Sequence, residues 1–404
     1  MREEAGNRSE VEAASPIPGW AVLAIVTFLQ VGISLLQATP AALGPLLTHD
    51  LGLSRAELGL LSSAIWGGML LGSLPAGLLV DRYGERVIVT AGVLAMAAFV
   101  SWAASATSFS LIFGLFLLSA VGASTASPGG TRAIAASFPR HRLGVALGIR
   151  QTGVMAGGLL ASLLLPPIAL GFGWPAAFRL GAAICLVAAA AFGLLYREPP
   201  LRQQAGSGFR LRSLLGNRAF LATTAYGFVF MGALGATISY LSLYLHEQVG
   251  MSVVAAAQIL AVTQLGGLCG RLGWGILSDR SGRRAPAMLA AGLLAVACSA
   301  AMVGTGRGTP LPLLAVLAFG LGVSALGWNA LSITAVSEAV PLRAAATALG
   351  ANLTVTFSAM FLISPLFGLI ADRTGSYRLS WIALAAWTGL GTLAALFLRE
   401  RRLP

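Results

Sequence analysis

Apolar runs of about 20 residues recur along the whole chain, and each is as long as a helix that crosses the hydrocarbon core of a bilayer. Only 10% of the 404 residues are charged, whereas a soluble domain carries roughly 25% charged residues. No soluble fold of this length keeps so little charge on its surface. The sequence therefore predicts an all-α integral membrane protein.

Charged residues and Gly/Pro breaks divide the apolar runs into about twelve transmembrane spans. The predicted spans are 20–40, 56–79, 87–106, 110–137, 144–168, 175–196, 218–243, 253–277, 285–304, 313–337, 345–370 and 380–398. A long polar stretch separates the sixth span from the seventh. We therefore expect two six-helix bundles, at 18–196 and 218–398, joined by a linker at 197–217, with tails at 1–17 and 399–404.

Arginine accounts for the net charge of +12, since the chain contains no lysine. Most of the arginines fall in both tails, in the linker and in the loops on the same side of the predicted bundle. Short loops rich in positive charge stay in the cytoplasm. We expect both termini to be cytoplasmic and the protein to lie in a bacterial inner membrane, with lipids and not nucleic acid as its surroundings.

The two halves repeat each other in sequence. The segment Gly77–Arg86 recurs as Gly275–Arg284, with an offset of 279 − 81 = 198, and Leu147–Thr152 recurs as Leu349–Thr354, with an offset of 350 − 148 = 202. Two ordered matches at nearly one spacing indicate duplication of a six-span unit. Such repeats place a substrate site at their interface, near the middle of the membrane.

The segment Gly77–Arg86 resembles the cytoplasmic loop motif of the major facilitator superfamily, Gly-x-Leu-x-Asp-Arg-x-Gly-Arg-Arg. The resemblance extends from about residue 18 to 400 and implies that superfamily's transporter fold. Ile149–Val154 is similar to bacterial anion permeases of the cyanate and nitrate/nitrite type, and Gly368–Tyr377 resembles monocarboxylate-type carriers. One departure concerns proton coupling: the arginine of the fourth-span Arg-x-x-x-Gly pattern is Leu118 here if Gly122 is that glycine.

The loop motif predicts a gate between conformations. Its glycines should let helices approach closely, and its acids, placed where the helix dipole disfavours them, need a cation or a helix N-terminus as partner. A loop that only fixes topology is the alternative. The residues of this predicted cytoplasmic gate are Gly77, Asp81, Arg82, Gly84, Arg86, Asp279 and Arg280.

Arg150 is the foremost candidate for contact with a substrate. It falls nearly two turns into the fifth span, beside Gln151, and it aligns with Asn352 in the eleventh span. A charged residue within the membrane marks a binding site or pathway by default, and a guanidinium can bind a carboxylate through two parallel hydrogen bonds. An arginine that snorkels to the cytoplasmic surface is the alternative.

Two further arginines are weaker candidates. Arg132 lies near the end of the fourth span, where it can snorkel or line a cavity. Arg271 lies two turns before Asp279 in the eighth span, where it can contact substrate or hold the acid of the motif.

Neutral polar and aromatic side chains would complete a mixed pocket, although each is more often a packing residue than a ligand contact. The candidates are Gln37, Trp66, Tyr240, Gln264 and Asn329, together with Gln30, Tyr226 and Trp328.

No carboxylate falls at the centre of a predicted span, whereas a proton relay normally needs one. Arginines without acids in the membrane indicate a substrate that supplies its own negative charge. A coupled proton would then travel on the substrate or on a peripheral acid such as Glu57.

These features predict a secondary transporter that moves a small organic or inorganic anion, such as a monocarboxylate, by alternating access. An efflux carrier for hydrophobic or cationic compounds is the alternative, and it would need an acid in an aromatic cavity. A membrane sensor or scaffold would need a soluble domain, and an enzyme would need a His/Asp/Glu cluster. We expect no cofactor or metal, and a monomer.

Overall fold

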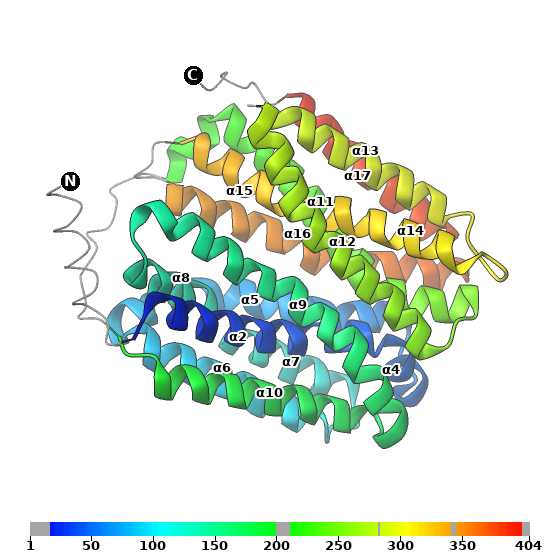
Figure 1. Cartoon of the computed structure of the whole chain (residues 1–404). Coiled ribbons are helices and arrows are strands. Elements are labelled where there is room, and N and C mark those ends of the chain that lie inside the picture. Colours follow the sequence, from blue (N-terminus) through cyan, green and yellow to red (C-terminus); the bar gives the residue numbers. More distant parts are fainter. Residues whose placement is uncertain (1–16, 199–210, 282, 341–344, 398–404) are drawn as a thin grey trace, which may run out of the picture. The chain divides into compact units, whose positions relative to one another are not determined.

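The computed structural model describes residues 17–198, 211–281, 283–340 and 345–397 (Figure 1). Of these described residues 88% are helical, and none of them forms a strand. Twelve helical segments are long and apolar enough to cross a bilayer, and each coincides with one predicted span. The prediction of an all-α membrane fold with twelve spans is therefore confirmed.

Large apolar side chains remain exposed along these helices. Leu74 is 75% exposed, Phe172 78% and Leu194 76%. Water would penalise so much exposed apolar surface, whereas lipid tails do not. In lipid every backbone polar group must find a partner within the protein, and a helix achieves this internally.

The described residues form two compact units. Unit 1 comprises residues from 1–39 and 67–204, and unit 2 comprises residues from 40–66 and 205–404. This division differs from the two predicted bundles in one respect, because residues 40–66 group with the second unit. Helix α5 (Arg55–Tyr83) therefore begins in unit 2 and continues in unit 1.

Unit 1 is built around two pairs of neighbouring helices. In Figure 1, α2 packs along α9 and α6 packs along α10. Besides the later part of α5, the helices of unit 1 are α2 (Gly19–Gln37), α6 (Glu85–Ala103), α7 (Phe109–Ala123), α8 (Ala126–Ser137), α9 (Arg140–Phe172) and α10 (Trp174–Leu195).

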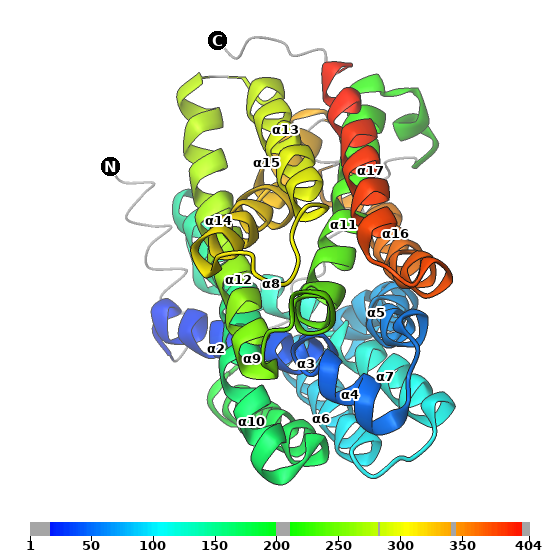
Figure 2. The ribbon, with the colours of Figure 1, turned by 90° about the vertical axis from the view of Figure 1, so that its right-hand side faces the viewer.

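Unit 2 repeats this pairing of its first span with its fifth and of its third with its sixth. Helix α11 packs along α16, and α13 packs along α17 (Figure 2). The shared pattern is what duplication of a six-span unit predicts. The described elements of unit 2 are the start of α5 and α3 (Thr39–Ala42), α4 (Gly44–Leu51), η1 (Leu211–Gly216), α11 (Arg218–Tyr244), η2 (Leu245–Val249), α12 (Val253–Ser281), α13 (Ala285–Met302), α14 (Leu311–Leu321), η3 (Gly322–Leu326), α15 (Asn329–Glu338), α16 (Ala345–Thr374) and α17 (Arg378–Leu396).

The fourth span of each unit is interrupted. In unit 1, α7 ends and α8 begins around Ser124 and Thr125, whose hydroxyl groups donate to the carbonyl oxygens of Val121 at 2.7 Å and Gly122 at 2.8 Å. In unit 2, the π-helical turn η3 separates α14 from α15. Side-chain hydroxyls that bond back to the preceding turn, and π-helical turns, both bend helices.

Glycine lets helices approach closely at several contacts of the described residues. A Cβ at Gly266 or Gly322 would overlap the backbone of the facing helix, and a Cβ at Gly129 would overlap Val89. Glycine is therefore needed where α12 meets α14 and η3. At Gly77 and Gly275 the prediction is wrong in this structure, because a Cβ there would meet no atom within 4 Å.

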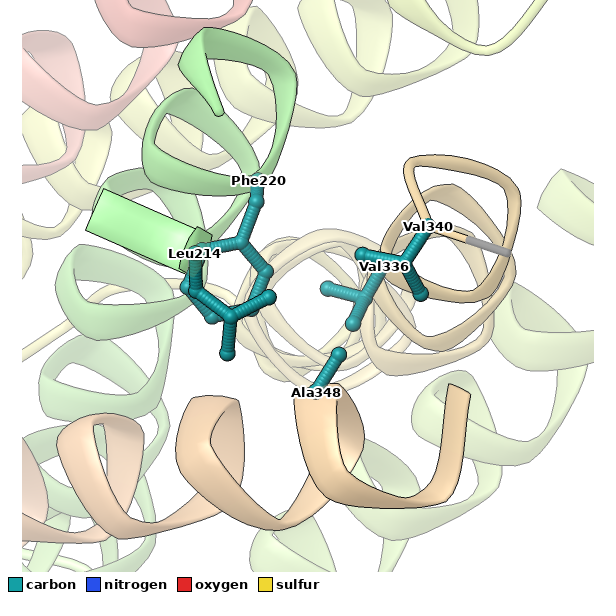
Figure 3. Close-up of a cluster of buried hydrophobic side chains, with 5 residues drawn as sticks. All are labelled: Leu214, Phe220, Val336, Val340 and Ala348. Carbon is teal, nitrogen blue, oxygen red and sulfur yellow. The ribbon is translucent and has the colours of Figure 1, made fainter. Parts of the chain in front are cut away.

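A small cluster of buried apolar side chains lies in unit 2, where η1 precedes α11. Figure 3 shows Leu214 of η1 and Phe220 of α11 facing Val336, Val340 and Ala348. The Asn217 side chain accepts the Phe220 N–H at 3.1 Å and donates to the Ala339 carbonyl at 2.6 Å. Such a cap satisfies one of the free N–H groups at the start of a helix.

We expect Leu214→Ala to lower the thermal stability of the purified protein clearly, because loss of a buried leucine costs about 2–5 kcal/mol. Leu215→Ala is the matched control, since Leu214 is 3% exposed and its neighbour Leu215 is 69% exposed. Melting temperatures in one detergent compare the two variants. Equal melting temperatures for both would contradict the packing of η1 on this cluster.

Candidate substrate site

Arg150 lies within unit 1, ten residues after the first residue of α9. Its side chain is buried, with 6% exposed. It does not snorkel to a surface, because its guanidinium contacts two other helices of the unit. This placement favours the binding-site interpretation of the residue over the snorkelling one.

Three oxygen atoms hold the guanidinium. One terminal nitrogen donates to the Thr131 hydroxyl at 3.0 Å. The other donates to Gln30 Oε1 at 3.2 Å and to the Ala126 carbonyl at 2.9 Å. The Nε atom is buried and has no hydrogen-bond partner. The fork is thus oriented by neutral groups from α2 and α8, and its Nε–H group is not used in a hydrogen bond.

The charge of Arg150 is not neutralised by any described residue. Other arginines, Arg55, Arg132 and Arg284, have carboxylates within 4.0 Å, but Arg150 has none among the residues that the structure describes. A buried charge without a counter-charge is costly. An anion that arrived beside it would remove that cost.

The surroundings of Arg150 are shaped to hold it. Gly130 has no side chain, and a Cβ there would lie 3.1 Å from Arg150 Nε and from the Val26 side chain. The Gln30 amide nitrogen donates to Ser34 Oγ at 3.1 Å, which directs its oxygen to the guanidinium. Two helices of unit 1 therefore position one arginine.

Asn352, the counterpart of Arg150 in the sequence repeat, occupies a comparable place in unit 2. It is 3% exposed on α16, and its amide nitrogen donates to Thr224 Oγ1 of α11 at 3.0 Å. The fifth span of each unit thus presents a polar side chain to the first span.

Arg271 is a second arginine without a counter-charge. It lies on α12 within unit 2, its Nε is buried, and the described residues provide it with neither a hydrogen-bond acceptor nor a carboxylate. It does not hold an acid of the loop motif in the part of the chain that is described.

The remaining predicted pocket residues divide between the units. In unit 1, Gln37 Nε2 is buried without a partner and Gln151 is half-buried. In unit 2, Gln264 Oε1 is buried without a partner, Trp66 lies 5.5 Å from Phe357 between ring centroids, Asn329 is half-buried, and the Tyr240 hydroxyl donates to the Arg55 carbonyl at 2.7 Å.

Sequence reasoning missed two of the groups that hold Arg150. Thr131 and the Ala126 carbonyl were not singled out, and Gln30 was treated as a pocket residue without a link to the arginine. A signal for Gln30 existed, because a glutamine in an apolar span needs a partner. The Ala126 carbonyl carried no signal, because helix packing alone decides which backbone oxygen a side chain of another helix reaches.

The loop motif of unit 1 forms a network at the junction of α5 and α6. Arg132 of α8 lies 3.3 Å from Asp81 and 3.1 Å from Glu85, while Arg86 Nε donates to the Gly193 carbonyl at 2.7 Å. Gly84 has a φ of 85°, which favours glycine. Arg132 thus pairs with motif acids, whereas the sequence left open whether it lines a cavity.

The other motif residues take less part in contacts. The Arg82 guanidinium carbon lies 5.1 Å from the centre of the Tyr83 ring, and Arg280 is exposed. The side chain of Asp279 lies outside the described residues.

A second ionic network lies within unit 2, at the start of α5. Arg55 Nε lies 2.8 Å from Glu247 Oε2, and the Asp372 carboxylate accepts the N–H groups of Arg55 at 3.2 Å and Ala56 at 2.8 Å. The Tyr377 hydroxyl donates to Glu247 at 2.9 Å. A carboxylate at a helix N-terminus is stabilised by the free N–H groups and the helix dipole.

A family model described as Major Facilitator Superfamily matches residues 21–364. In overall structure the chain is similar to a bacterial homologue of the human lysosomal transporter Spinster in an inward-facing, unoccupied conformation. The TM-score is 0.76 and the identity 20%, over 95% of each chain.

Curated relatives match along most of their length. The chain is 28% identical to an uncharacterised MFS-type transporter of Mycobacterium tuberculosis, over 95% of this chain and 85% of the relative. It is 24% identical to a probable galactarate/D-glucarate transporter of Bacillus subtilis, over 85% and 83%. It is 26% identical to a probable sulfoacetate transporter of Cupriavidus necator, over 88% and 87%.

We expect Tyr240→Phe to lower the free energy of unfolding by about 1 kcal/mol, because it removes the hydrogen bond from the buried hydroxyl to the Arg55 carbonyl. Tyr226→Phe is a control of the same kind, since that hydroxyl donates to the Met288 carbonyl at 3.0 Å. Melting curves with and without D-glucarate would separate the roles of Tyr240. Unchanged stability with loss of the ligand-induced shift would make Tyr240 a substrate contact instead.

Proposed function

Because the chain belongs to the Major Facilitator Superfamily, we propose that it carries a small organic anion across the membrane, with Arg150 binding the anionic group. The superfamily consists of transporters, so this chain is a multi-pass membrane transporter and not an enzyme. The class of substrate and the role of Arg150 in binding it are proposals.

The observation that carries the proposal is a buried arginine without an acid. Arg150 is 6% exposed, is oriented by neutral oxygens only, and keeps a buried Nε–H unpaired. Charge-assisted hydrogen bonds to a carboxylate or sulfonate are among the strongest polar contacts in proteins. A substrate anion would supply the missing counter-charge and an acceptor together.

The names of these relatives support an anionic substrate. Galactarate and D-glucarate carry carboxylates, and sulfoacetate carries a sulfonate and a carboxylate, so both relatives are named for organic anions. By analogy we assign this chain to the same broad substrate class.

The distribution of acids also supports an anion over a cation. Every described acid within a helix lies among the first or last three residues of its span or short helix, as Glu57, Glu85 and Asp372 do. An efflux carrier for cations would need a carboxylate deep in a span. A proton, if it is coupled to transport, would travel on the substrate or on an acid at a helix end.

Arg271 is the candidate for a further anion contact, because its buried Nε has no hydrogen-bond partner among the described residues. We also propose that the protein works as a monomer in a bacterial inner membrane, with its termini in the cytoplasm. The arginine-rich loops support that orientation.

We expect Arg150→Gln to weaken the binding of D-glucarate, sulfoacetate or 4-hydroxybenzoate by about 10- to 100-fold, the effect of losing a hydrogen bond to a charged group. Binding is measured as ligand-induced thermal stabilisation of purified protein. Uptake of the same anion into proteoliposomes should fall in parallel. Arg150→Lys should recover binding only in part, because lysine lacks the planar fork.

Arg179→Gln is the matched control, because Arg179 lies in the same unit, is exposed and bonds only the Ser105 hydroxyl at 3.1 Å among the described residues. It should bind and transport anions normally. If Arg150→Gln transports anions as well as the unmodified protein, the assignment of the site is wrong. Stabilisation by lipophilic cations alone would make the protein an efflux carrier instead.

A further inference from the structure

The segment that follows α10 folds back onto the start of α6. Tyr196 is fully buried, its ring stacks on Phe192 with centroids 4.9 Å apart, and its hydroxyl donates to Glu85 Oε1 at 2.7 Å. Two residues later, Glu198 Oε1 accepts the backbone N–H of Glu85 at 3.1 Å. Tyr196 therefore anchors Glu198 over the first turn of α6.

Glu198 serves as a cap for α6 from a distant part of the chain. The helix begins after Gly84, which has no side chain to offer, and the Glu198 carboxyl accepts the N–H group of Glu85. A Cβ at Gly84 would overlap both carboxyl oxygens of Glu198. The carboxyl therefore lies directly against the motif loop, at a position that glycine alone leaves open.

Glu85 is an unusually buried acid. Its side chain is 1% exposed, and its Oε2 atom has no hydrogen-bond partner among the described residues, although Arg132 Nε lies 3.1 Å away. A buried oxygen that lacks a hydrogen bond is costly.

Because the Glu198 carboxyl accepts the backbone N–H of Glu85 at 3.1 Å, the two acids are neighbours at the start of α6. Two ionised carboxylates are both acceptors, so a hydrogen bond between them requires one proton. Burial, together with the neighbouring Glu85 carboxyl, raises the pKa of Glu198 to about 7.

The other charged and titratable side chains near the two carboxyls come from α5, α6, α8 and the segment that follows α10. Asp81 at the end of α5 adds a third acid, 3.3 Å from Arg132. Arg132 of α8 is shared between Asp81 and Glu85, and Arg86 directs its Nε to the Gly193 carbonyl. Tyr196 completes the set. One arginine thus serves two acids, Asp81 and Glu85, and no salt bridge to Glu198 is found among the described residues.

We propose that the Glu85–Glu198 carboxyl pair binds one proton, and that this proton keeps the segment after α10 docked on the motif loop. With the proton bound, the two carboxyls share a hydrogen bond and Glu198 caps α6. Without it, two adjacent carboxylates repel each other while Arg132 is already shared with Asp81. Glu198 then leaves the loop, and the cap on α6 is lost.

This site is separate from the anion site of Arg150 and does not depend on the substrate assignment. In a transporter, this site would make the conformation of the loop at the junction of α5 and α6 depend on pH. Docked and released forms of that loop would differ in transport rate, whichever anion is carried.

The direct test is infrared difference spectroscopy of the reconstituted protein between about pH 6 and about pH 8, where a group of pKa near 7 changes its charge. We expect a protonated-carboxyl band that disappears with a midpoint near neutral pH. Glu198→Gln should lack the band. Glu85→Gln should move its midpoint to lower pH, because the neighbouring carboxyl is removed while the burial of Glu198 remains. Glu57→Gln, whose carboxylate only accepts from Ser54 at 2.8 Å and 3.0 Å, should leave it unchanged.

Hydrogen exchange tests the docking. Protection of the Glu85 and Arg86 amides, corrected for intrinsic exchange rates, should fall as the pH rises through about 7 and should not depend on pH in Glu198→Gln. The absence of the band from the unmodified protein, its persistence in Glu198→Gln, or unaltered protection across this range would each overturn the proposal.

The pH dependence of the melting temperature is a third test, and the direction of its change follows from the raised pKa of Glu198. The pKa of Glu198 is raised in the folded state, so the folded protein holds this proton more tightly than the unfolded chain does. The stabilisation is complete below about pH 4.5 and is lost as the pH rises to about 7. We expect this component of the melting temperature to be missing in Glu198→Gln and present in Glu57→Gln.

Discussion

The cost of leaving a polar group without a partner in hydrocarbon governs this structure. Backbone N–H and C=O groups cannot bond to lipid, so the spans are helical and the described residues contain no strand. Where a span is interrupted, the freed groups are used. At the break between α7 and α8, the Val121 and Gly122 carbonyls in the last turn of α7 accept the Ser124 and Thr125 hydroxyls.

The same cost explains how the charges are distributed. The described acids of the helices lie near helix ends, where N–H groups, arginines or water can meet them. Asp372 accepts two N–H groups at the start of α5, and Glu198 accepts the Glu85 N–H at the start of α6. Both caps come from segments distant in sequence, and each satisfies free N–H groups in the first turn of a helix.

Arg150 breaks this rule, since it lies away from a helix end and no described carboxylate is near it. Neutral oxygens from α2 and α8 orient its guanidinium but do not cancel its charge. A structure that only needed to be stable would replace such a residue by an apolar one. We explain Arg150 by an anionic ligand that supplies the missing counter-charge. We explain the neighbouring acids Glu85 and Glu198 by a bound proton.

The sequence by itself determined the membrane class, the twelve spans and the internal repeat, because span length and apolar composition are local properties. It also placed Arg150 within a span and the acids at the ends. Only the tertiary structure showed that Thr131, Gln30 and the Ala126 carbonyl hold Arg150, that Arg132 pairs with Asp81 and Glu85, and that Glu198 rests on Gly84. These contacts join helices far apart in the chain, and helix packing alone decides which side chains meet.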